Sequence, residues 1–136
     1  MKNQNLAGPN GAIAGSNSSA RPKKDLAVRT RAYALRIIRL YQAIPKSGEG
    51  QIMGRQILKS GTSVGAHVAE SCHPKSRADF TCKIDGAMQE LEETLFWMDV
   101  LADSGTVKAP RLKALEDESH ELMAIFVSMV KKTRGK

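Results

Sequence analysis

The feature that most constrains this chain is the recurrence of apolar residues at intervals of three, four and seven positions in four successive segments. Such intervals place apolar side chains on one face of an α-helix, because a helix repeats every 3.6 residues. The longest segment carries the pattern at Phe80, Ile84, Leu91, Leu95 and Met98. No segment shows the strict alternation that predicts a β-strand. The periodicity predicts four helices, over about residues 25–44, 51–72, 76–104 and 110–132.

Helix-breaking and helix-capping residues separate these segments. Pro45 and Pro74 cannot continue a helix, and Gly105 suits the position just past a helix end. Ser76 with Asp79 three residues later resembles a capping box that opens the third helix. Because the connections are short, consecutive helices must run antiparallel. The predicted fold class is all-α, an antiparallel up-down-up-down four-helix bundle.

The N-terminal segment has a different composition. Residues 1–22 are rich in Gly, Asn, Ser, Ala and Pro and show no periodicity, so we expect a disordered tail. Residues 23–134 then form the single domain. The chain lacks a signal-peptide core and an apolar run of about 20 residues, which predicts a cytoplasmic protein with no membrane partner. Cys72 and Cys82 are expected as free thiols.

Small residues nearly fill the middle of the second predicted helix. Glycine weakens an isolated helix, so tertiary packing must stabilise this one, and small side chains let a neighbouring backbone approach closely. The apolar arc of the first predicted helix is about 160° wide, more than one buried face requires. Both features suggest surfaces beyond a monomeric core. The small residues are Ser60, Gly61, Thr62, Ser63, Gly65, Ala66 and Ala69.

Positive charge is concentrated in the N-terminal half. Residues 1–68 hold eleven Lys or Arg against Asp25 and Glu49, whereas residues 69–136 hold ten against twelve acidic residues. This asymmetry predicts a polyanionic partner, with nucleic acid favoured and a membrane surface as the rival. Aromatic residues make up only 4% of the chain, which favours contact with the nucleic-acid backbone over base stacking.

The candidate phosphate-binding residues lie on and just before the first predicted helix. Three arginines fall on the side opposite the apolar arc, and three further cations precede them. The alternative is that this basic face is simply solvated. The set is Arg21, Lys23, Lys24, Arg29, Arg36 and Arg39.

Motifs for catalysis or metal binding are absent from the sequence. Two carboxylate–histidine pairs have the spacing of di-iron bundles, but His73 and His120 would sit roughly 15 to 20 Å apart along the bundle axis. Cys72, His73, His67 and Cys82 match no paired zinc-ligand spacing. We expect no catalytic residue, no cofactor and no metal, and therefore not an enzyme.

Three acidic residues adjoin two aromatic ones in the third predicted helix. Leu91, Leu95 and Met98 mark its core face, so the acids form either a solvated face or contacts with the basic helix of a neighbouring subunit. In the second case Trp97 would anchor the oligomer, because large aromatics dominate interface energies. The residues concerned are Glu90, Glu92, Glu93, Phe96 and Trp97.

Three stretches, Ser60–His67, Ser76–Phe80 and Glu90–Met98, resemble a family of bacterial four-helix-bundle proteins. The members are encoded in intervening sequences of 23S ribosomal RNA genes, and accessory proteins of diversity-generating retroelements are relatives. His67 stands where the family usually has Asn. The resemblance implies a homopentamer that associates with nucleic acid, and it transfers no catalytic residue.

Residues and resemblance together predict a non-catalytic oligomeric scaffold that binds RNA or DNA through the first helix. The alternative is a protein-interaction hub that recruits a partner such as a reverse transcriptase. The residues expected at the oligomer interface are Ser63, Gly65, His67, Glu93 and Trp97.

Overall fold

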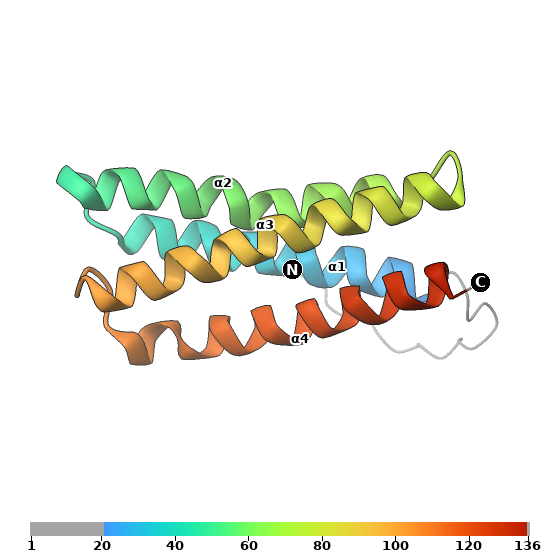
Figure 1. Cartoon of the computed structure of the whole chain (residues 1–136). Coiled ribbons are helices and arrows are strands. Elements are labelled where there is room, and N and C mark those ends of the chain that lie inside the picture. The colour runs from blue at the N-terminus through green and yellow to red at the C-terminus, as the bar shows by residue number, and fades with distance from the viewer. Residues whose placement is uncertain (1–20, 136) are drawn as a thin grey trace, which may run out of the picture.

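The computed structural model describes residues 21–135, which form four α-helices joined by short turns (Figure 1). Consecutive helices run in opposite directions along a common axis, and the described part contains no β-strand. This architecture confirms the predicted all-α, antiparallel four-helix bundle. The helices are α1 (Arg21–Ala43), α2 (Gly48–Ser71), α3 (Arg77–Asp103) and α4 (Ala109–Arg134).

The first two helices begin earlier than the sequence predicted. α1 begins at Arg21, so the expected tail over residues 1–22 overlaps the helix by two residues. Pro22 is compatible with this start, because the first turn of a helix needs no N–H donor. The rest of the expected tail lies outside the described residues. α2 begins at Gly48, three residues early, with Ser47 at its N-cap position.

The start of α3 follows the predicted capping pattern. The Ser76 hydroxyl accepts a hydrogen bond from the Asp79 backbone N–H at 2.9 Å. The Asp79 carboxylate accepts in return from the backbone N–H of Lys75 at 3.0 Å, one residue before the cap. At the other end of the helix, Gly105 adopts φ +76°, a conformation that favours glycine. Local sequence therefore sets both ends of α3.

The core is built from the faces that the periodicity identified. On α1, Leu26, Tyr33 and Ile37 are buried, whereas Leu40 is only partly buried. Thr30 completes this stripe, fully buried, and its hydroxyl donates to the Leu26 carbonyl at 2.9 Å. The sequence prediction passed over Thr30 because it counted only apolar residues.

Glycines of α2 let α1 approach closely along much of its length. A Cβ placed on Gly61 would lie 2.6–2.8 Å from side-chain atoms of Ile37, and one on Gly65 would lie 3.2 Å from the Thr30 carbonyl oxygen. Gly54 faces the Tyr41 ring in the same way. The predicted close approach is confirmed. Because packing within one chain uses these glycines, they do not by themselves require an oligomer.

Two further properties of the described residues concern the state of the cysteines and the hydropathy of the helices. Cys72 and Cys82 are both free thiols, as expected. None of the four described helices carries a stretch apolar enough to cross a membrane.

Candidate nucleic-acid interface

Arg29 is paired with two carboxylates of α4. Its Nε lies 2.7 Å from Glu118 Oε2, and its Nη2 lies 2.8 Å from Glu118 Oε1 and 2.6 Å from Glu121 Oε1. These hydrogen bonds raise the pKa of Arg29 and hold the pKa of Glu118 below its usual value. The sequence places Arg29 on the side of α1 opposite the apolar arc, and in the structure this side chain meets α4, a neighbour about which a helical wheel of α1 contains no information. The predicted contact of Arg29 with phosphate remains untested.

One turn further along, Tyr33 makes a second polar link between α1 and α4. Its hydroxyl lies 2.6 Å from Ser119 Oγ, and both residues are buried. Ser119 donates its proton to the Leu115 carbonyl at 2.8 Å, so Tyr33 is the donor to Ser119. Burial raises the pKa of Tyr33 to about 12. The phenol is therefore neutral at physiological pH and fixes the spacing of the two helices.

Arg36 and Arg39 lie at the edge of a hollow that the sequence did not predict. Arg111, from the first turn of α4, joins them around a space of about 360 Å³ between α1 and α4. Within the described residues, none of the three guanidinium groups forms an ion pair. We call this space, together with the three arginines that line it, the arginine hollow. Its remaining lining is Leu40, Ala43, Leu112, Ala114 and Leu115.

Arg111 could have been found from the topology. In an up-down-up-down bundle, the beginning of α4 lies at the same end as the last turns of α1, so a basic residue there must lie near Arg39. The charge pattern of a single helix does not contain this residue, because Arg111 belongs to α4.

The remaining predicted cations lie at the other end of the bundle. Arg21, Lys23 and Lys24 belong to the first turns of α1, roughly 22 to 27 Å along the helix axis from Arg39. Their side chains lie outside the described part of the structure. The predicted basic set is thus divided between two ends of α1, with the paired Arg29 between them.

Among the predicted interface residues, His67 packs within its own chain. A Cβ placed on Gly86 of α3 would lie 3.0 Å from the His67 ring, so the absence of a side chain at Gly86 makes room for the imidazole. The ring Nδ1 is buried and has no hydrogen-bond partner among the described residues, and it lies 3.7 Å from Glu70 Oε1. His67 therefore fills a space between α2 and α3.

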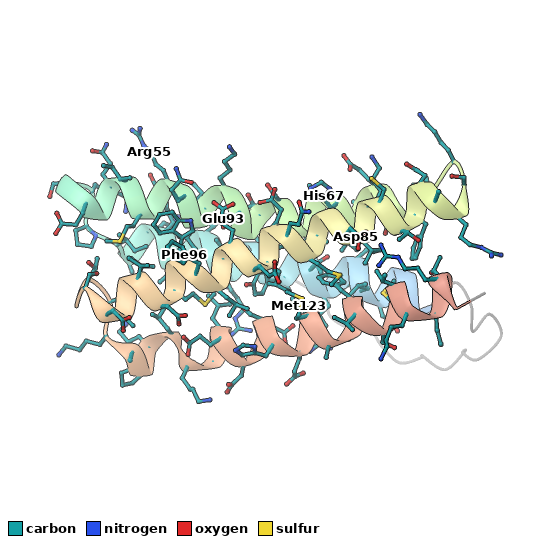
Figure 2. The ribbon with its side chains drawn as sticks, viewed as in Figure 1. Arg55, His67, Asp85, Glu93, Phe96 and Met123 are labelled. Carbon is teal, nitrogen blue, oxygen red and sulfur yellow. The ribbon has the colours of Figure 1, made fainter. Side chains whose placement is uncertain are left out.

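Trp97 also makes its polar contact within its own helix. The indole N–H donates to Glu93 Oε2 at 3.2 Å, and the Phe96 ring stands edge-on at a centroid distance of 4.9 Å. Glu93 and Phe96 lie together on the outside of α3 (Figure 2). Ser63 likewise donates to the Lys59 carbonyl of α2 at 2.7 Å. Whether these residues contact another subunit remains a prediction.

Two of the three stretches that carry the family resemblance, Ser60–His67 and Glu90–Met98, meet inside the bundle. Thr94 of α3 and Ser60 of α2 are buried, and their hydroxyls are hydrogen-bonded at 2.8 Å. His67 and Gly86 pack together two helical turns away from this pair. The resemblance therefore covers residues that join α2 to α3.

Residues suited to metal binding are scattered over the described part of the chain. No three His, Cys, Asp or Glu side chains between residues 21 and 135 gather closely enough to share a metal ion.

Comparison with known proteins identifies one family. The sequence model of the 23S rRNA-intervening sequence protein family matches residues 24–128. A crystal structure from Bacteroides thetaiotaomicron VPI-5482, described as a protein of unknown function from the S23 ribosomal protein family, has the same fold. It is 30% identical with a TM-score of 0.74, and the match covers 78% of this chain and 98% of that one. No curated protein matches the sequence.

Proposed function

This chain belongs to the 23S rRNA-intervening sequence protein family, and we propose that it is a non-catalytic, oligomeric scaffold that binds the nucleic-acid backbone through the arginine hollow. The arginine hollow is the observation that carries this proposal. Three guanidinium groups from two helices line it and form no ion pair with a carboxylate of residues 21–135, and the planar guanidinium fork matches the geometry of phosphate oxygens.

The composition of the hollow favours phosphate over bases as the ligand. Its lining consists of arginine, leucine and alanine side chains, with no aromatic ring on which a base could stack. The same lining offers no nucleophile and no general base, which supports a binding role. Recognition would therefore depend on charge and backbone shape, with little dependence on sequence.

Arg29 does not belong to the proposed binding set. Its guanidinium already meets Glu118 and Glu121, and a phosphate would have to displace both carboxylates. In an oligomer, each subunit would contribute one arginine hollow, and several weak contacts acting together would raise the affinity.

Fluorescence anisotropy with a labelled RNA duplex and a DNA duplex tests this proposal across a salt series. The test variant replaces Arg36, Arg39 and Arg111 by alanine. The control replaces Lys75, Lys131 and Lys132, three exposed cations elsewhere on the surface, and has the same net charge. We expect at least a roughly tenfold loss of affinity for the test variant, and a slope of log affinity against log salt smaller by about two to three.

Equal losses in the two variants would show that net charge alone attracts the polyanion. No binding by the wild-type protein at low salt would overturn the proposed function. Light scattering on each variant establishes that the arginine substitutions leave the mass in solution unchanged.

A further inference from the structure

One face of the bundle combines exposed apolar side chains with positive charge. On α1, Val28 is 70% exposed and Leu35 is 49% exposed, with the exposed Arg31 between them at helical spacing. On α2, Arg55 and Lys59 are exposed along the same stripe as Thr62 and Ala66. We call this surface the α1–α2 basic face.

A hollow of about 400 Å³ lies in this face, between the two helices. Val28 and Arg31 line it on the α1 side, and small residues of α2 form the other wall. The floor offers no large side chain of its own, so a bulky residue could enter. The complete lining is Ala27, Val28, Arg31, Ala34, Thr62, Gly65, Ala66 and Ala69.

The outer face of α3 has the opposite character. Phe96 lies at the centre of this face and is 56% exposed. Exposed carboxylates surround it at helical spacing. Within the described residues, none of these carboxylates forms an ion pair. We call this surface the α3 acidic face. Its carboxylates are Glu92, Glu93, Asp99 and Asp103.

The two faces belong to different sides of the molecule. α3 lies in front in the view of Figure 1, and α1 lies behind it. Figure 2 places Phe96 and Glu93 on α3, whereas Arg55 projects outward from α2. One chain therefore cannot bring its own two faces together.

We propose that the α3 acidic face of one copy of this chain docks on the α1–α2 basic face of a second copy, with Phe96 entering the hollow beside Val28. This inference rests on the oligomeric part of the proposed function and names the surfaces that form the contact. Each copy uses one face of each kind, so the interface is heterologous and the subunits associate head to tail.

Charge complementarity identifies the second copy as the occupant. The chain carries a net charge of +7, so two copies repel each other unless opposite charges meet locally. The carboxylates around Phe96 and the cations around Val28 supply that local attraction, and the apolar side chains supply area to bury. Exposed aromatic residues such as Phe96 commonly anchor an interface by filling a pocket.

A complementation experiment distinguishes this arrangement from a symmetric one. Variant one carries Val28→Glu, which breaks the basic face, and variant two carries Phe96→Ser, which breaks the acidic face. Both positions are exposed, so folding should be retained, and circular dichroism checks this. Light scattering without nucleic acid gives the mass of the wild type, of each variant and of their equimolar mixture.

We expect an oligomeric wild type, two monomeric variants and a 1:1 heterodimer in the mixture, because each variant retains the face that the other lacks. A monomeric wild type, or variants that remain oligomeric, would overturn the inference. Two monomeric variants that fail to pair would exclude the head-to-tail arrangement. Nucleic-acid binding is measured separately by anisotropy, so failure of this inference is distinguishable from failure of the arginine hollow to bind phosphate.

Discussion

Helix α1 packs against its two neighbours in opposite ways. Against α2 it makes close contact, with Ile37 over Gly61 and the Thr30 backbone over Gly65. Against α4 the contact is made by long polar side chains, Arg29 reaching Glu118 and Tyr33 reaching Ser119. The first contact depends on shape and apolar burial, whereas the second depends on hydrogen bonds and charge. The stability of the two contacts should therefore respond to different perturbations.

The largest effect is expected at the close α1–α2 contact. Gly61→Val would place side-chain atoms where Ile37 already lies, and the fully buried Ile37 has no free space to move into. We expect a loss of about 3 kcal/mol in the free energy of unfolding, at the upper end for overpacked cores. Urea denaturation measures it. Ala124→Val, at an exposed position of α4, is the control for adding a β-branched residue to a helix.

A smaller effect is expected from breaking the ion pairs between α1 and α4. Arg29→Met keeps much of the side-chain length but leaves the half-buried Glu118 carboxylate without its partner. We expect destabilisation of about 2 kcal/mol, typical of a lost hydrogen-bonded charge. Lys113→Met, which removes a fully exposed pair with Asp117, should leave the unfolding midpoint unchanged. An unchanged midpoint for Arg29→Met would show that α1 and α4 are held by apolar contacts alone.

The hydrogen bond of Tyr33 should contribute less. Tyr33→Phe removes the phenol hydroxyl but preserves the buried ring, and Ser119 still donates to the Leu115 carbonyl. A loss of about 1 kcal/mol is expected, the usual contribution of a neutral buried hydrogen bond. Combining Tyr33→Phe with Arg29→Met in a double-mutant cycle measures whether the two α1–α4 links are coupled. Strictly additive losses would show that the links act independently.

The smallest effect is expected from acid. Arg29 lowers the pKa of Glu118 in the folded state, so the stabilisation is fully present above the ordinary glutamate pKa, near 4.5. It decreases as pH falls from that value through the lowered folded-state pKa, because protons then bind more readily to the unfolded chain. Denaturation between pH 6 and 3 should show a steeper loss for the wild type than for Arg29→Met. Parallel pH profiles would contradict this assignment.

A feature of this fold could be predicted from the sequence when the residues that interact to form it lie close together in the chain. The four helices, the Ser76 cap and the turn at Gly105 depend on residues within a few positions of each other. The buried stripes were also predictable, because helical geometry relates sequence spacing directly to a face. Thr30 was missed because a threonine can satisfy its hydroxyl on its own helix and then pack as an apolar residue.

The candidate site was only partly predictable. Arg36 and Arg39 were identified from the charge pattern of α1, but Arg111 lies some seventy positions away, on α4. In the sequence Arg29 falls on the same side of α1 as Arg36 and Arg39, yet in the structure it pairs with carboxylates of α4. Arginines that the sequence places on one side of the same helix can thus have different roles, depending on which helix packs alongside.

The sequence by itself determined the class of fold, the antiparallel order of the helices and the concentration of positive charge in the N-terminal half. These properties follow from local periodicity, short connections and composition. The tertiary structure alone decided which arginine is paired, which arginines share a hollow and how His67 lies against Gly86. The reason is that each of these contacts forms only where two helices pack side by side. The packing energy comes from many residues that lie far apart in the chain.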